Sequence, residues 1–181
     1  QTAASEAVAV QVEQCLGVPL IHHVRTGTSV NTSLVYQESE NDEVEDLYAA
    51  ICTAKERFPD IQAVCSGAIL SNYQRIRVEH VCSRLNLQSL AYLWRYSQHE
   101  LLDAMIADRV HAVLVKTAAP PGLLPKHLNQ SLDHLQPLFT RLHDLYQFHV
   151  CGEGGEYETL VLDCPIFRKR LVLDQVTVEC D

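Results

Sequence analysis

A short segment between residues 151 and 159 concentrates side chains that could do chemistry. Its sequence is Cys151-Gly152-Glu153-Gly154-Gly155-Glu156-Tyr157-Glu158-Thr159, with three carboxylates within six residues. The glycines leave the backbone free to turn sharply, since glycine tolerates positive φ. Crowded like charges suit a cationic ligand, and Tyr157 adds a ring face of the kind that binds quaternary ammonium groups. A solvated turn is an equally good interpretation of the segment alone, because Gly-Gly between polar residues is a common turn signal.

A second candidate segment joins a predicted strand to a predicted helix. Ser66 and Gly67 follow the apolar run 61–65, and Arg75 and Arg77 lie on the helix that Ser71 is expected to cap. Ligands of open parallel sheets bind at the carboxyl ends of strands, and helix N-termini favour anions. Arginine there suits phosphate or carboxylate. Spacing alone favours a plain turn with solvated arginines, because the glycines match neither the dinucleotide-binding pattern nor the Walker phosphate loop.

Composition restricts the classes of protein to which the chain can belong. Its 181 residues fit one domain or two small ones. Hydrophobic residues make up 47% and charged residues 20%, which allows a sizeable core and argues against disorder. A net charge of −9 argues against direct nucleic-acid binding, which needs a basic face. We expect no membrane span, because no apolar run reaches about 18 residues, and we find no apolar leader.

The cysteines and histidines do not indicate a metal site. Seven cysteines occur without a Cys-x-x-Cys pair, and we predict reduced thiols in a cytoplasmic protein. Each cysteine is interpreted as a small buried hydrophobe rather than a nucleophile. His127 and His134 are seven residues apart, which favours a surface stripe over metal ligands.

Hydrophobic periodicity and capping residues predict the elements that must position these segments. Helices are expected at 3–16, from Asp42 onward with Glu45 completing a capping box, and at 71–85, 97–106 and 131–146. Strands are expected at 19–24, 61–65, 90–93 and 112–116, and then at 148–151, 159–163, 169–173 and 176–180. The early alternation is typical of a parallel doubly wound sheet, and the late strands are expected to be antiparallel. We place the domain boundary so that the domains are 1–95 and 96–181.

Four stretches of the chain closely resemble the diphthine–ammonia ligase family, also called diphthamide synthetases or ATP-binding domain 4 proteins. They are DEVEDLY (42–48), GAILSNYQRIRVE (67–79), LNLQSLAYLW (85–94) and CGEGGEYETLVLDCPIF (151–167). The likeness runs from Gln1 to about Leu173. Several long motifs in one order make this resemblance far more specific than a single glycine pattern.

The resemblance implies an α/β fold: a HUP-type doubly wound parallel sheet of the N-type ATP pyrophosphatases, followed by a smaller C-terminal α+β domain for substrate recognition. It implies ATP-dependent amidation of diphthine to diphthamide on translation elongation factor 2. ATP, with Mg²⁺, would adenylate the carboxylate of diphthine, and ammonia would then displace AMP.

The resemblance also implies roles for individual residues. The catalytic residues would be Glu153, Glu156 and Glu158. Gly152, Gly154, Gly155, Tyr157 and Thr159 would bind the diphthine substrate, which carries a trimethylammonium group. The nucleotide would be bound by Ser66, Gly67, Arg75 and Arg77, and no residue is assigned to a metal.

One family motif does not occur in residues 1–181. The family's phosphate loop, Ser-Gly-Gly-Lys-Asp-Ser, follows the first strand of its sheet, and neither that loop nor that strand is recognised here. The acids beside Gly154 and Gly155 would repel phosphate, so this glycine pair is no substitute. We therefore expect the 181-residue chain by itself not to turn over ATP.

Three functions are compatible with these patterns. The first is the ligase. The second is a non-catalytic paralogue or fragment that binds elongation factor 2 or nucleotide without turnover, which the missing loop favours. The third is an N-type ligase that acts on another carboxylate, which the intact acidic motif disfavours.

Overall fold

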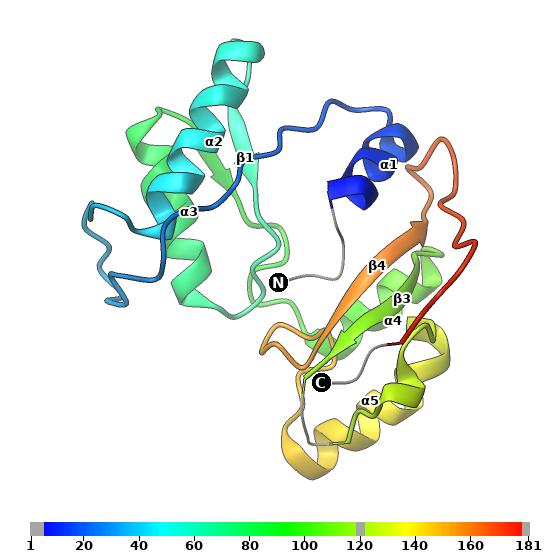
Figure 1. The fold of residues 1–181 in the computed structure, drawn as a ribbon. Helices are drawn as coiled ribbons and strands as arrows, with labels where there is room; N and C mark the ends of the chain where they lie inside the picture. Colours follow the sequence, from blue (N-terminus) through cyan, green and yellow to red (C-terminus); the bar gives the residue numbers. More distant parts are fainter. Residues whose placement is uncertain (1–5, 119–121, 179–181) are drawn as a thin grey trace. The chain divides into compact units, whose positions relative to one another are not determined.

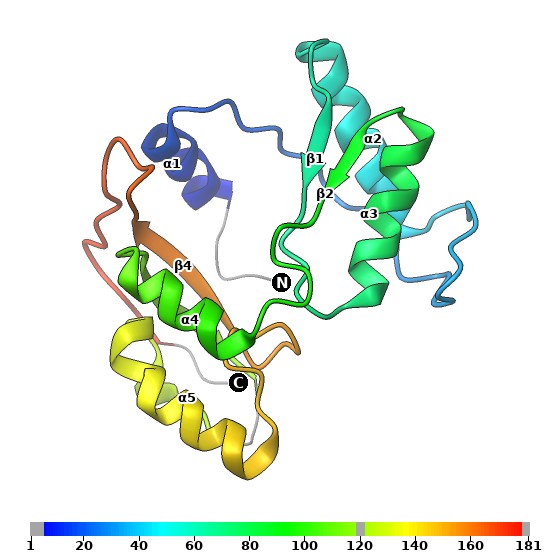
Figure 2. The same cartoon turned by 180° about the vertical axis from the view of Figure 1, so that it is seen from behind.

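The chain forms two compact units in a computed structural model that describes residues 6–118 and 122–178. Ile21–Arg95 form one unit, here called the central unit (Figures 1 and 2). The described residues on both sides of that range form the other, called the flanking unit. Each unit has its own cluster of buried apolar side chains.

The central unit is built around a parallel pair of strands joined by a helix. Its elements are α2 (Glu43–Arg57), β1 (Ala63–Cys65), α3 (Asn72–Arg84) and β2 (Gln88–Leu90). Ala63 of β1 is paired with Gln88 of β2, and α3 lies beside the two strands (Figure 2). The buried side chains between the helices and strands are Tyr36, Val44, Ile51, Val81, Cys82 and Leu87.

A buried carboxylate fixes the loop that precedes α2. Asp42 is the N-cap of α2, and its Oδ1 accepts a hydrogen bond from Val44 N (2.9 Å). Its Oδ2 accepts from Val30 N (3.0 Å) and Asn31 N (2.7 Å). Asp42 is only 1% exposed, so these three donors replace the water that its charge would otherwise require. The same side chain thus starts the helix and holds the loop.

Asp42 should make the stability of the central unit depend on pH. Desolvation raises the pKa of its carboxyl, but the hydrogen bonds from Asn31, Val44 and Val30 outweigh this effect and hold the pKa below its usual value. A depressed pKa in the folded state contributes stability above the unfolded pKa of about 3.9, and this stability is lost as the pH falls through the folded pKa. The variant Asp42→Asn should therefore lose less free energy of unfolding than the wild type between about pH 5 and pH 2.

Urea unfolding across that pH range measures the difference. Asp60→Asn is the matched control, because Asp60 is exposed. Parallel pH curves for the wild type and Asp42→Asn would contradict the prediction.

Glu45 does not complete the capping box that the sequence predicted. Its carboxylate accepts a hydrogen bond from Tyr36 Oη (2.9 Å) and forms two hydrogen bonds with Arg84 (3.0 and 2.9 Å). The backbone N–H of Asp42 donates instead to Ser39 O (3.1 Å). The prediction was wrong because a bidentate guanidinium is a stronger partner for a carboxylate than one backbone N–H group.

The flanking unit packs helices on one face of an antiparallel pair of strands. Its elements are α1 (Glu6–Leu16), α4 (Gln98–Ala107), β3 (His111–Thr117), the 3₁₀ turn η1 (Pro125–His127), α5 (Leu132–Tyr146) and β4 (Tyr157–Asp163). The pairing of β3 with β4 runs from His111 opposite Asp163 to Thr117 opposite Tyr157. The elements are drawn in Figure 1.

The core of the flanking unit comes from the apolar face of α5. Leu132, Leu135, Phe139 and Leu142 recur at helical spacing and are all buried. They pack with Leu102 of α4, with Ala112 and Leu114 of β3, and with Phe148, Val150 and Tyr157. The last three residues flank the acidic segment, so the core reaches directly to it.

The predicted helices and three of the predicted strands are confirmed with small shifts, and β2 begins two residues before its predicted start. No strand forms at 19–24, 148–151 or 169–173, and these predictions were wrong. The partner of β4 is the distant β3, residues 148 and 149 are irregular, and residues 150 and 151 form a turn. Residues 176–178 are irregular, and the rest of the strand predicted at 176–180 lies outside the described residues.

The observed architecture is mixed α/β with two small sheets. A two-stranded parallel pair agrees with this class but does not distinguish a HUP-type doubly wound sheet, which stays a prediction. One boundary between the two units falls after residue 95 of the chain, near the predicted position. However, α1 belongs to the flanking unit, where Cys15 O accepts a hydrogen bond from Arg168 N (2.7 Å). The division into domains 1–95 and 96–181 therefore stays a prediction. Among the described helices, none is long and apolar enough to cross a membrane.

Candidate functional site

The acidic segment folds as a tight loop between α5 and β4; residues 149–158 are called the acidic loop. Gly152 N donates to His149 O (2.8 Å), and Gly155 N donates to Gly152 O (3.1 Å). Gly152 (φ +73°) and Gly155 (φ +84°) have the left-handed conformation that other residues rarely adopt. The sequence-predicted glycines therefore set the turns that bring the three glutamates onto one short loop.

Glu156 folds back over the start of the loop. Its Oε1 accepts a hydrogen bond from His149 N (2.9 Å), whereas its Oε2 is buried without a hydrogen-bond partner. A Cβ at Gly154 would lie 2.7 Å from Glu156 Oε1, so a side chain at residue 154 would displace the carboxylate of Glu156. A buried acceptor without a partner costs about 1–3 kcal/mol, which favours the uptake of a cationic group beside it.

The other two glutamates face basic groups. The side chain of Glu153 is 12% exposed, and its Oε2 lies 3.9 Å from His149 Nε2. Glu158 Oε1 is 3.2 Å from Lys116 Nζ, its opposite residue on β3, and Glu158 Oε2 is buried without a hydrogen-bond partner. Neither Lys116 nor His149 was predicted from the sequence to belong to this site. The sequence signal for His149 is its position four residues before Glu153.

Tyr157 belongs to the core rather than to the surface of the loop. It is 6% exposed, and its ring stacks on Phe139 with the centroids 4.8 Å apart. Its Oη donates to Val150 O (2.6 Å), and burial raises the pKa of the phenol. The sequence led us to expect a ring face open to a cation. In the structure the ring of Tyr157 is instead covered by Phe139 of α5. Thr159 lies two residues further along β4, opposite Leu114.

Cys151 is unsuited to nucleophilic chemistry. Burial, with Glu153 nearby, raises the pKa of its thiol to about 11, so the reactive thiolate is scarce near neutral pH. Its Sγ donates to Gln98 O (3.1 Å) at the start of α4. The six described cysteines are all free thiols; Cys15 and Cys82 are buried, whereas Cys65 is exposed, so the interpretation of every cysteine as a buried hydrophobe was wrong for Cys65.

In the central unit, Ser66 and Gly67 directly follow β1. Gly67 is exposed, its φ lies outside the left-handed region, and a Cβ placed on it would meet no atom within 4 Å. Neither packing nor backbone conformation therefore requires glycine here. Ser66 N donates to Leu90 O (2.9 Å), and Ser66 Oγ is buried without a partner. An open space beside an unpartnered hydroxyl is suited to a ligand.

The two arginines of α3 have different environments. Arg75 is partly exposed, pairs with Glu79 and lies over the ring of Trp94, with Cζ 4.5 Å from the ring centroid. Arg77 is only 4% exposed and donates to the carbonyl oxygens of Asn31 and Ser33. This burial is at odds with the expectation that Arg77 contacts a nucleotide, because its guanidinium holds the loop before α2.

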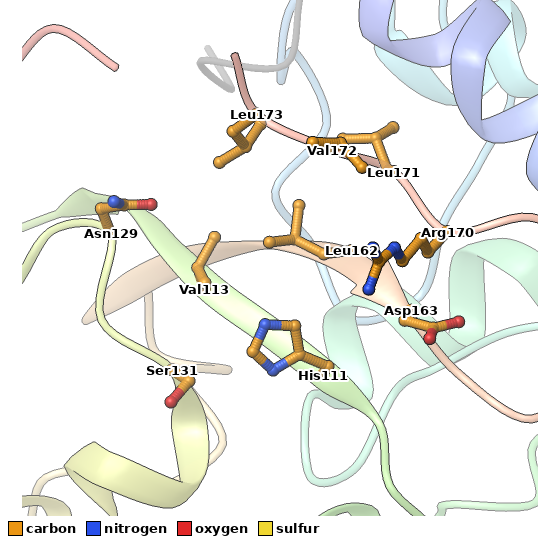
Figure 3. Close-up of a pocket in the computed structure, with 10 residues that line it drawn as sticks. All are labelled: His111, Val113, Asn129, Ser131, Leu162, Asp163, Arg170, Leu171, Val172 and Leu173. Carbon is orange, nitrogen blue, oxygen red and sulfur yellow. The ribbon is translucent and has the colours of Figure 1, made fainter. Parts of the chain in front are cut away.

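The flanking unit also has an open cleft of about 560 Å³ at the His111 end of β3 and β4 (Figure 3). The acidic loop joins β4 opposite Thr117, six residues further along β3. At about 3.4 Å per residue, this places the cleft roughly 20 Å from the loop. The cleft is therefore separate from the glutamates. It is lined by His111, Val113, Asn129, Ser131, Leu162, Asp163 and Arg170–Leu173.

The described part of the chain contains no cluster of side chains that could form a metal centre by itself. Within residues 6–118 and 122–178, no group of three or more His, Cys, Asp or Glu side chains is placed to hold a metal ion. The acidic loop agrees with this, since two of its glutamates face His149 and Lys116.

Comparison with known proteins identifies the chain's relatives. The family models "Diphthamide synthase N-terminal domain" and "Diphthamide synthase C-terminal domain" match residues 4–89 and 98–180. The chain is 47% identical to diphthine–ammonia ligase from Bos taurus over 179 residues, which are 98% of this chain and 66% of that protein. It is 47% identical to the Danio rerio enzyme over 175 residues, 96% of this chain and 68% of that protein.

A fungal relative is much longer. Diphthine–ammonia ligase of Schizosaccharomyces pombe is 49% identical over 167 residues, which are 92% of this chain and 27% of that protein. The chain thus spans about two thirds of the vertebrate relatives and about a quarter of the fungal one. With this identity over nearly its whole length, the chain belongs to the diphthine–ammonia ligase family.

Proposed function

We propose that the chain takes part in the ATP-dependent amidation of diphthine to diphthamide on translation elongation factor 2, in the cytoplasm. The observation that carries this proposal is the acidic loop, which holds three glutamates and leaves Glu156 Oε2 and Glu158 Oε2 buried without hydrogen-bond partners. The relatives of the chain are named for diphthine and ammonia. Diphthine carries a permanently charged trimethylammonium group, and ammonia supplies the amide nitrogen.

The loop suits these two substrates in different ways. A trimethylammonium group has no N–H to donate, so it is bound by charge alone, and Glu153 and Glu156 supply that charge. Ammonia can donate hydrogen bonds, and Glu158 is the proposed acceptor for it. Such acceptors act strongly in a site from which water is excluded. Adenylation of the diphthine carboxylate then provides AMP as the leaving group for attack by ammonia.

The nucleotide site is proposed at the end of β1 in the central unit, within a HUP-type sheet. We propose that ATP approaches the backbone at Gly67, beside the unpartnered hydroxyl of Ser66. Arg75 is proposed to orient phosphate or the acyl-adenylate. Mg²⁺ would enter with the phosphates of ATP. Arg77 holds the preceding loop and is left out of the site.

A turnover assay tests the proposal. The protein at the length found in its own cells is incubated with ATP, ammonium and diphthine-bearing elongation factor 2, and AMP, pyrophosphate and diphthamide are measured. We expect all three products in equal amounts. Binding of elongation factor 2 without any product would instead identify a non-catalytic binding module.

The variant Gly67→Val tests the nucleotide site. The added side chain enters open space, so the free energy of unfolding should change by less than about 0.5 kcal/mol. The affinity for ATP should fall, because the branched side chain occupies the proposed approach, while the affinity for elongation factor 2 should not change. Isothermal titration measures both affinities. Unchanged ATP affinity in a folded variant would place the nucleotide elsewhere.

A further inference from the structure

His149 contacts two of the three glutamates of the acidic loop. Its backbone N–H donates to Glu156 Oε1 (2.9 Å). Its ring Nδ1 faces Glu153 N (3.4 Å), and its Nε2 lies 3.9 Å from Glu153 Oε2. One residue thus touches both carboxylates that we propose to hold the substrate cation.

The contacts indicate which nitrogen of the His149 ring carries the hydrogen. Because the backbone N–H of Glu153 is a donor, Nδ1 must be the acceptor, so the neutral ring carries its hydrogen on Nε2. That nitrogen is buried without a hydrogen-bond partner, and its nearest carboxylate oxygen, on Glu153, is too far for a hydrogen bond. A small shift of Glu153 toward the ring would give Nε2–H an acceptor.

The backbone on which His149 lies is held from both sides. Its neighbours Phe148 and Val150 are buried in the core. Phe148 O contacts His143 Nδ1 (2.8 Å) on α5, and Val150 N donates to Gln98 Oε1 (2.7 Å) on α4. The backbone at His149 is therefore a fixed point of the loop.

We propose that His149 is a positioning residue that aligns Glu153 and Glu156 for the trimethylammonium group of diphthine. The inference rests on the proposed function and adds a residue to it. Without the ring, Glu153 N loses the acceptor Nδ1 and the carboxylate loses the nearby imidazole, so Glu153 is held less firmly beside Glu156. Recognition of the cation should then weaken, while ATP binding in the central unit should not.

Two substitutions distinguish the contributions of the two ring nitrogens of His149. In His149→Asn the side-chain oxygen can replace Nδ1 as the acceptor for Glu153 N. In His149→Gln the amide can replace the Nε2–H donor toward Glu153 Oε2. Both variants keep the backbone N–H that holds Glu156. His149→Ala removes both ring contacts, and His134→Ala is the matched control because His134 is exposed on α5.

The test compares binding of free diphthine with that of its tert-butyl analogue, in which carbon replaces the charged nitrogen. The wild type should prefer diphthine, and His149→Ala should lose roughly 10- to 100-fold of that preference. His149→Gln should recover most of it, and His134→Ala should keep it. KM for ATP should be unchanged throughout.

The outcomes separate this inference from the proposed function. If the wild type prefers the cation and His149→Ala keeps the full preference, then His149 does not position the loop. A folded His149→Gln that shows none of the preference would contradict the role as well, also where His149→Ala does not fold. If the wild type shows no preference for the cation and forms no diphthamide, the proposed function fails and the role of His149 fails with it.

Discussion

Replacing Glu156 by glutamine is expected to reduce kcat/KM for amidation of diphthine by roughly 30-fold or more. Loss of one partner of a desolvated charge pair costs about 2–5 kcal/mol in recognition, and that cost appears directly in kcat/KM. The fold should stay intact, because the amide oxygen of glutamine can still accept the hydrogen bond from His149 N. The measurement is diphthamide formation at several concentrations of elongation factor 2.

Asp144→Asn serves as the control for this result. It makes the same change from acid to amide on an exposed part of the flanking unit, at α5, and should leave amidation unchanged. Normal amidation after Glu153, Glu156 and Glu158 are all changed to glutamine would show that the acidic loop does not bind the substrate.

Replacing Phe139 by alanine is expected to lower the free energy of unfolding of the flanking unit by about 3–5 kcal/mol. Phe139 is fully buried, and its ring lies 4.8 Å from that of Tyr157 and 5.4 Å from that of Phe148. The change removes an aromatic side chain from the centre of the core and leaves a cavity beside two further rings. Urea unfolding followed by circular dichroism gives the difference.

The exposed aromatic residue of the same helix provides the comparison for Phe139. Tyr146 lies at the end of α5 and is exposed, so Tyr146→Ala should change the free energy of unfolding by less than about 0.5 kcal/mol. Equal effects of the two substitutions would mean that the three rings do not form the core of this unit.

Local rules in the sequence identified most of the helices. Ser71 caps α3 as predicted, and Ser97 caps α4; their side chains accept hydrogen bonds from the backbone N–H groups of Gln74 and Glu100. These contacts involve residues three positions apart, so a short window contains them. The strand at 157–163 was found as well, but its partner is β3, more than 40 residues earlier. Hydrophobic alternation indicates a strand without naming its neighbour.

Distant contacts give Arg77 and Tyr157 surroundings that the sequence does not predict. Arg77 is held by Asn31 and Ser33, at separations of 46 and 44 residues, and nothing near Arg77 in the sequence predicts this. Tyr157 stacks on Phe139 of another element. The three glutamates of the acidic loop are grouped by their spacing in the sequence, and their role stays a prediction. The basic group that faces Glu158 comes from β3, and finding it required the strand register.

The placement of Tyr157 bears on how the acidic loop recognises a ligand. Its ring is fixed in the core, and the residues on either side of it in the chain carry two of the three charges. The conformational entropy of these backbone positions is therefore lost during folding, before any ligand arrives. A loop preorganised in this way spends less of its interaction energy on ordering itself, so even a weakly interacting cation such as a trimethylammonium group can be held selectively.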